Sequence, residues 1–150
     1  MNWVFLFISL TAAFGLADQP KEEAIAAEQK LLQGKWQVVK FMDQSEQDAP
    51  PEEIKEMTFE FKDGVLIIAK NKDGRGPALP YRLDPTKKPK WIDLNMGHPY
   101  PWVEGIYQIE GNELKVCVIG GARGGKVPAR PKEFKAKKQE KYSLFVLKRI

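Results

Sequence analysis

The chain has 150 residues, a formal net charge of +4 and one cysteine, so its length fits a single domain and an intramolecular disulfide is excluded. It has one histidine, His98, which excludes sites built from several imidazoles. The charge is uneven, because residues 120–150 carry ten basic and two acidic side chains, which makes the rest of the chain net acidic.

Residues 1–17 are uncharged, and their apolar run is shorter than the roughly 20 residues that a membrane-spanning helix needs. Gly15 and Ala17 place small residues before a polar stretch that starts at Asp18, as signal-peptide cleavage requires. The segment has no Lys or Arg before the apolar run, and the alternative is an uncleaved anchor. We predict a signal peptide over residues 1–17 and an exported protein, periplasmic or extracellular, that is held together by packing alone.

Residues 21–33 are rich in Ala, Glu, Gln and Leu, with apolar residues at helical spacing, and Gly34 is placed to end a helix. Residues 18–33 are therefore predicted to form a short helical lead-in. This helix would cap one open end of the domain that follows.

From residue 34 the apolar pattern changes to the alternation of β-strands. Residues 57–62 alternate and are joined to residues 65–69 by the tight turn Lys62-Asp63-Gly64, and a second hairpin joins 105–109 to 114–118. Eight strands are enough for a small barrel whose interior holds side chains or one small ligand. We predict an all-β fold for residues 34–150, a small up-and-down antiparallel barrel. The other four strands are predicted at 35–41, 79–83, 91–94 and 142–148.

Two long connections interrupt the strands. Residues 42–56 contain Pro50 and Pro51, after which a short helix can begin. Residues 120–141 contain too many glycines and prolines for regular structure over most of their length.

Trp36 opens the first strand and Arg149 lies on the last. Closure of a barrel brings these two strands side by side, so the guanidinium can lie over the indole ring. Such a cation–π contact contributes roughly 0.5–2 kcal/mol. We expect the pair to act as a structural latch that holds the register and does no chemistry.

Several blocks of the sequence are distinctive. They are residues 32–39, the Asp-Pro-Thr-Lys stretch within 83–93, Gly105-Ile106-Tyr107 with 111–114, Cys117, Arg130-Pro131 with Phe134, and Leu147-Lys148-Arg149. In this order, over about residues 31–150, they resemble an uncharacterised lipocalin-like domain family abundant in planctomycete bacteria. The resemblance implies a barrel with an apolar cavity and carries no assigned activity.

Motifs for catalysis or nucleotide binding are incomplete. Residues 120–126 match the first seven positions of a phosphate-binding loop, but Val127 stands where Ser or Thr would bind magnesium and prolines block the following helix. His98 lies in a rigid Gly-Pro loop, and Asp84 is placed for turn formation more than for acid–base work with Asp93. We predict no catalytic residue, no metal and no cofactor, although an enzyme site assembled from distant loops would escape a motif search.

Aromatic residues on predicted strands would line a cavity if one is present, with Arg82 and Tyr107 as its polar anchors. The cavity candidates are Phe59, Phe61, Tyr81, Arg82 and Tyr107. Our first hypothesis is thus a monomeric, exported, non-enzymatic barrel that binds a small hydrophobic or amphipathic ligand.

The alternative is a barrel with a packed interior that docks on an acidic protein or an envelope surface through the basic loop 120–141. Nucleic acid is not an expected partner, because the loop lacks a patterned set of aromatic platforms. The candidate docking residues are Arg123, Lys126, Arg130, Lys135, Lys137 and Lys138.

Overall fold

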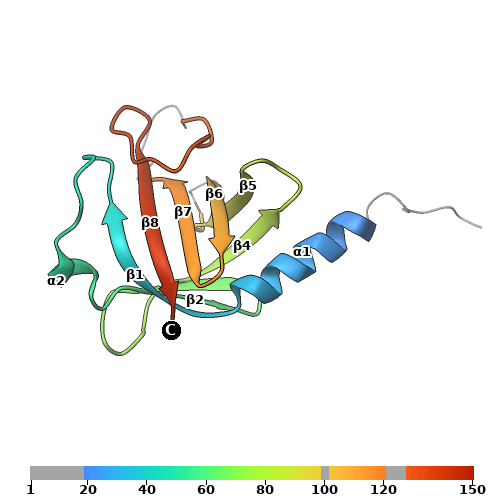
Figure 1. Cartoon of the computed structure of the whole chain (residues 1–150), viewed down its shortest axis with the longest axis horizontal. Helices are drawn as coiled ribbons and strands as arrows, with labels where there is room; N and C mark the ends of the chain where they lie inside the picture. Colours follow the sequence, from blue (N-terminus) through green and yellow to red (C-terminus); the bar gives the residue numbers. More distant parts are fainter. Residues whose placement is uncertain (1–18, 99–101, 121–127) are drawn as a thin grey trace, which may run out of the picture.

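The structure is a computed structural model that describes residues 19–98, 102–120 and 128–150. Within these residues, eight antiparallel strands form a closed barrel in which each strand pairs with the next and the last pairs with the first (Figure 1). This confirms the predicted all-β, up-and-down barrel with an N-terminal helix. The elements are α1 (Gln19–Leu32), β1 (Gly34–Met42), α2 (Pro51–Ile54), β2 (Thr58–Lys62), β3 (Val65–Ala69), β4 (Ala78–Asp84), β5 (Lys90–Asn95), β6 (Trp102–Glu110), β7 (Glu113–Ile119) and β8 (Tyr142–Arg149).

Local sequence explains the tight turns of the barrel. Asp63 and Gly64 both have positive φ, at 50° and 79°, which is the backbone of a two-residue turn whose twist matches that of paired strands. Gly34 has a φ of 105° and lets the chain leave α1 and enter β1 at once.

Barrel closure occurs between β1 and β8. Trp36 lies directly opposite Arg149 in this pairing, and a bulge between Val38 and Lys40 shifts the register farther along. Arg149 Cζ lies 4.1 Å from the centre of the Trp36 ring, as expected from the sequence. Arg149 also donates to the carbonyl oxygens of Leu31 and Gln33, at 2.6 and 2.8 Å, so the latch also holds the end of α1.

The barrel interior is sealed at the end next to α1 and becomes more exposed toward the other end. Trp36, Phe61 and Leu147 are fully buried, and each lies near the point where α1 enters β1. Farther from α1, Phe41, Ile68, Val103 and Phe145 are only partly buried, whereas Phe59 and Leu94 are buried. Ile54 of α2, Met57 and Ala49 also belong to or pack against this core. On five strands the exposed fraction of the inward side chain increases with distance from α1. The pairs are Trp36 and Phe41, Leu66 and Ile68, Tyr107 and Val103, Leu114 and Val118, and Leu147 and Phe145.

A second apolar cluster lies on the outside of the barrel wall. Residues 128–137, which we call the strap, cover the outer face of β5 to β8, where Ile106 and Cys117 are completely buried. Phe134 of the strap packs into this cluster, and the Cys117 thiol donates to the carbonyl oxygen of Lys135 at 3.5 Å. The strap thus gives one wall of the barrel an apolar layer on each side.

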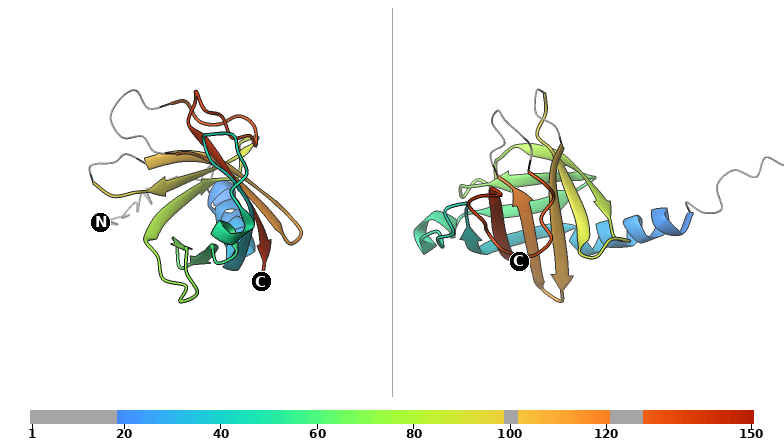
Figure 2. Two further views of the ribbon diagram at one scale, coloured as in Figure 1. Left: turned by 90° about the vertical axis from the view of Figure 1, so that its left-hand side faces the viewer. Right: turned by 90° about the horizontal axis from the view of Figure 1, so that it is seen from above.

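The two helices lie at opposite sides of the barrel, as both Figure 1 and the right-hand view of Figure 2 show. The short helix predicted in the connection 42–56 is present as α2, and it begins at the second proline, Pro51, instead of after it. Among the described residues, we find no helix with the length and apolar character needed to cross a membrane.

Candidate functional site

Four of the five cavity candidates face the barrel interior. Side chains alternate between the two faces of a strand, and these four occupy positions that point into the barrel. All four are buried: Phe59, Phe61, Tyr81 and Tyr107. The Phe61 and Tyr81 rings meet edge to face at 5.3 Å, which is a favoured geometry for an aromatic pair. These residues therefore belong to a continuous aromatic interior.

The hydroxyl of Tyr81 is the one polar feature of this interior that the protein itself leaves unsatisfied among its described residues. Tyr81 is 6% exposed, and its Oη atom has no hydrogen-bond partner within the described part of the chain. Burial raises the pKa of the Tyr81 phenol, so the group stays a neutral donor and acceptor at physiological pH. A buried hydroxyl without a hydrogen-bond partner destabilises the folded protein by about 1–3 kcal/mol. A bound molecule that bonds the Tyr81 hydroxyl would recover this free energy.

Tyr107 has a different environment at the sealed end. Its hydroxyl donates to Glu28 Oε2 of α1 at 3.0 Å, and Lys90 Nζ lies 2.5 Å from Glu28 Oε1. Burial, and then the neighbouring Glu28 carboxylate, raise the pKa of the Tyr107 phenol. Tyr107 thus joins α1 to the barrel, and its hydroxyl is not free for a ligand.

Apolar side chains form the more open end. Phe41 and Phe145 stack at 4.5 Å, and Phe145 also meets the Phe59 ring at 5.1 Å. Ile68 and Val103 pack against the same core and are partly exposed. An entry from this end would be lined by aromatic and aliphatic surface, which suits an apolar molecule.

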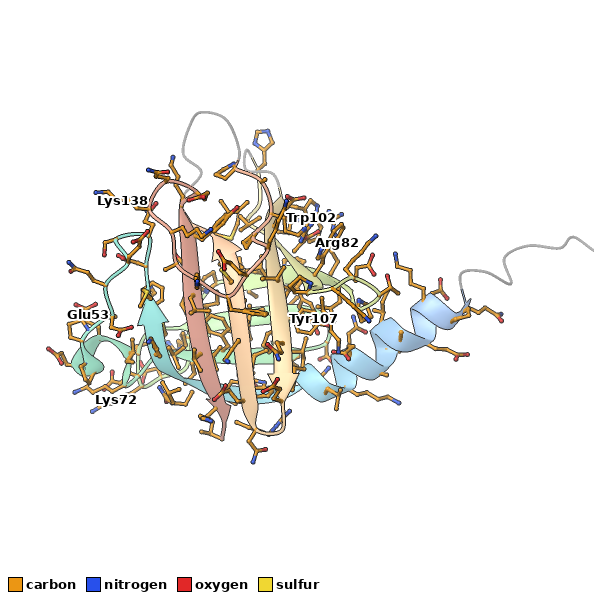
Figure 3. All side chains as sticks on the ribbon, turned by 45° about the horizontal axis from the view of Figure 1, so that its top comes forward. Glu53, Lys72, Arg82, Trp102, Tyr107 and Lys138 are labelled. Carbon is orange, nitrogen blue, oxygen red and sulfur yellow. The ribbon has the colours of Figure 1, made fainter. Side chains whose placement is uncertain are left out.

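Arg82 does not lie inside the barrel, so its predicted role as a cavity anchor is wrong. Tyr81 faces inward, and alternation along β4 therefore places Arg82 on the outer face, with 60% of its side chain exposed. The guanidinium lies 4.4 Å from the Trp102 ring and donates to Asp93 Oδ2 at 2.9 Å. Figure 3 shows Arg82 beside Trp102.

A pocket of about 330 Å³ lies outside the barrel wall at this point. Its central groups are Asp93, which is buried, and Arg130 of the strap, whose Nη1 lies 2.6 Å from Asp93 Oδ1. Arg130 also donates to Glu104 and to the carbonyl oxygen of Gly105, and it stacks at 4.1 Å on Trp91. Because these buried groups already bond one another, the arrangement fixes the strap to the wall. The pocket is lined by Lys21, Arg82, Leu83, Asp84, Trp91, Asp93, Glu104 and Arg130.

The basic docking loop is less available than its sequence suggests. Arg130 is only 13% exposed and is fully committed to Asp93 and Glu104, so it cannot serve as a docking residue without breaking that pairing. Lys135 and Lys137 both pair with Glu133, at 3.6 and 2.8 Å. Lys138 is exposed and bonds Glu46 through its backbone amide. Arg123 and Lys126 lie outside the described residues.

The turn expected at Asp84 forms. Asp84 Oδ1 accepts from the hydroxyl of Thr86 at 2.5 Å and from its backbone amide at 3.2 Å. The Thr86 hydroxyl is the main cause of the lowered pKa of Asp84. His98 is exposed, and within the described ranges no group of His, Cys, Asp and Glu is arranged to hold a metal ion.

Two features of the structure, one contact and one side-chain orientation, were not predicted from the sequence. Glu28 contacts Lys90 and Tyr107, which lie 62 and 79 positions farther along the chain. No local sequence pattern indicates contacts between residues so far apart. The outward position of Arg82 did have a signal, because alternation from Tyr81 to Leu83 leaves Arg82 on the opposite face.

Comparisons of the chain with protein-family models, with curated proteins and with solved structures returned no match. The closed eight-strand barrel is compatible with the lipocalin-like resemblance of the sequence. Such a fold is consistent with ligand binding but does not by itself carry a function.

Proposed function

We propose that this chain is an exported, non-enzymatic barrel that binds a small amphipathic ligand in its interior. The ligand enters at the end opposite α1, places its apolar body against Phe41, Ile68 and Phe145, and hydrogen-bonds the Tyr81 hydroxyl. Export rests on the sequence of residues 1–17.

The observation that carries the proposal is the unpartnered Tyr81 hydroxyl inside an aromatic interior. Native proteins pair most buried polar atoms, and each exception calls for a bound group or another explanation. Phe41, Ile68 and Phe145 are partly buried side chains at the end away from α1, and the Tyr81 hydroxyl lies deeper, beside Phe61, so a ligand that enters there must extend inward to reach it. Pockets for small ligands combine a mostly apolar lining with a few placed polar groups, and this interior has that composition.

The first test is native mass spectrometry of residues 18–150, the exported chain after signal-peptide cleavage, purified from an exporting host and compared with its denatured mass. A reproducible adduct that is lost on denaturation would support the proposal and give the ligand's mass. In parallel, binding of the uncharged probe N-phenyl-1-naphthylamine is followed by its fluorescence.

The variant Tyr81→Phe tests the polar anchor. It keeps the ring and removes the hydroxyl, and loss of one neutral hydrogen bond should weaken binding of the probe's amine about 2- to 10-fold. Tyr107→Phe is the matched control, because the Tyr107 hydroxyl is already bonded to Glu28 and its loss should leave the affinity unchanged. Probe binding that does not saturate, or that is the same in wild type and Tyr81→Phe, would argue against an interior site.

A further inference from the structure

We infer that the pocket on the outer wall of the barrel binds a small oxyanion, a carboxylate or phosphate group, between Arg82 of β4 and Lys21 of α1. At about 330 Å³ the pocket has room for one small molecule. It lies outside the barrel, so this site is separate from the interior site of the proposed function and either can fail without the other.

The strand register places the outward side chains of the pocket in two rows. Arg82 lies opposite Asp93, and Asp93 lies opposite Glu104, on neighbouring strands about 5 Å apart. The second row contains Asp84 and Trp91, which lie two residues, or about 7 Å, from the first row along the same strands. Arg82 is therefore beside Asp84 and two strands away from Glu104.

Arg82 is held in place but keeps its terminal nitrogens available. Its Nε donates to Asp93 Oδ2 at 2.9 Å, and its Cζ lies 4.4 Å from the centre of the Trp102 ring. The bond to Asp93 is the only side-chain hydrogen bond of Arg82 within the described ranges, and 60% of the side chain is exposed. A guanidinium fixed in this way presents Nη1 and Nη2 as two further donors, in a planar geometry that matches the oxygens of a carboxylate or phosphate.

Lys21 supplies a second cation on the same side of the pocket. It lies 3.0 Å from Asp84 Oδ2, and 48% of its side chain is exposed. An ammonium has three donors, so Lys21 can bond an anion in addition to Asp84. Asp84 also accepts two hydrogen bonds from Thr86, which stabilise its charge when Lys21 is shared. An oxyanion between Arg82 and Lys21 can therefore accept from both.

The carboxylates that line the pocket are already bonded to cations. Arg130 donates to Asp93 and to Glu104, and these contacts hold the strap to the wall. The lining contains three basic and three acidic side chains, which sum to zero, and Lys87 adds one positive charge 4.8 Å from the centre of the Trp91 ring. The surroundings are therefore weakly cationic, and binding should be weak and sensitive to salt.

The test is a two-dimensional proton–nitrogen NMR titration of the exported chain, residues 18–150, in a low-salt buffer. The titrants are sodium phosphate, sodium acetate and methylammonium chloride, with sodium chloride at the same ionic strength as the blank. The indole N–H groups of Trp102, on which Arg82 stacks, and of Trp91, which lines the pocket, report on binding. We expect saturable shifts with phosphate or acetate and none with methylammonium. The anion that binds more tightly identifies the acidic group of the ligand.

Variants separate the guanidinium from general positive charge. Arg82→Gln should raise the dissociation constant of the anion about 10-fold, because it removes charged hydrogen bonds at a partly exposed site. Arg82→Lys keeps the charge but loses the planar donor pair, and it should raise the constant by about 3-fold or more. Lys72→Gln is the matched control, because Lys72 is 84% exposed and lies far from Arg82 in Figure 3, and it should leave the constant unchanged. Circular dichroism checks that all three variants fold.

Three results would overturn the inference. The first is the absence of a saturable shift at either indole with both phosphate and acetate. The second is equal weakening by Arg82→Gln and Lys72→Gln, which would indicate attraction to the net charge of the protein instead of a site. The third is binding of methylammonium in place of the anions. The interior proposal is tested separately by the N-phenyl-1-naphthylamine probe and does not depend on these results.

Discussion

The two buried tyrosines of the interior should respond in opposite ways to loss of the hydroxyl. Tyr81→Phe removes an oxygen that has no partner in the described structure, and Tyr107→Phe removes a donor to the Glu28 carboxylate. Both side chains are buried, and both variants keep the aromatic ring. The comparison therefore isolates the hydrogen-bonding state of each hydroxyl.

The expected magnitudes follow from these contacts. An unsatisfied buried hydroxyl costs about 1–3 kcal/mol, so its removal should stabilise the ligand-free protein, by about 1 kcal/mol after the lost packing of one oxygen is allowed for. A hydrogen bond to a charged acceptor contributes about 1.5–3 kcal/mol, so Tyr107→Phe should destabilise the protein by about 2 kcal/mol. Lys90 remains beside Glu28, which keeps the loss within this range.

The assay is urea unfolding followed by far-ultraviolet circular dichroism, on protein from which bound molecules have been removed. A difference of about 3 kcal/mol between the variants corresponds to a separation of about 1–3 M in the urea midpoint for a slope of 1–3 kcal/mol per molar. A Tyr81→Phe variant that is less stable than wild type by more than about 1 kcal/mol would refute the reasoning, because the hydroxyl would then have a stabilising partner.

Three further predictions concern the latch, the strap and the thiol. Arg149→Ala should lower the free energy of unfolding by about 2 kcal/mol, because it loses a cation–π contact and two hydrogen bonds to the end of α1. An unchanged urea midpoint would show that the latch is dispensable. Arg130→Ala leaves Asp93 buried with only an exposed partner and should lower the free energy of unfolding by about 3–5 kcal/mol. Lys135→Ala, at an exposed position, should lower it by less than about 0.5 kcal/mol. Similar losses for the two variants would contradict the assigned pairing. Burial raises the pKa of the Cys117 thiol from 9.0 to about 11, so at pH 8 its alkylation by iodoacetamide should be about 100-fold slower in the native than in the unfolded chain. Because the folded state favours the neutral thiol, stability should be full below pH 9 and should fall between pH 9 and 11. Rapid native alkylation of Cys117 would mean that the strap opens readily.

The architecture was accessible from the sequence because it depends on local patterns. Alternation defines each strand, Asp63-Gly64 defines a turn, and the Trp36 and Arg149 pair marks the strands that must meet. Arg82 shows the limit of this reading. It was grouped with inward residues by its chemistry, although its parity relative to Tyr81 placed it outside.

The candidate site needed the tertiary structure. Whether a hydroxyl is satisfied depends on what lies within 3 Å of it, and for Tyr107 that neighbour is Glu28, 79 positions away. Arg130 lies in a basic segment of the sequence, which suggested a solvent-exposed docking residue. In the structure its guanidinium is paired with the buried Asp93, so it does not have that role.

The sequence alone therefore determined the number and order of the strands, the closure of the barrel and the aromatic character of its interior. These properties follow from two-residue alternation and from turn residues, which act over a few positions. Only the tertiary structure decided that the interior is sealed beside α1, that Tyr81 keeps an unpartnered hydroxyl and that the strap residue Arg130 is buried in an ion pair. Those properties depend on the stagger of the strands around the barrel and on contacts between segments far apart in the chain, which local patterns do not encode.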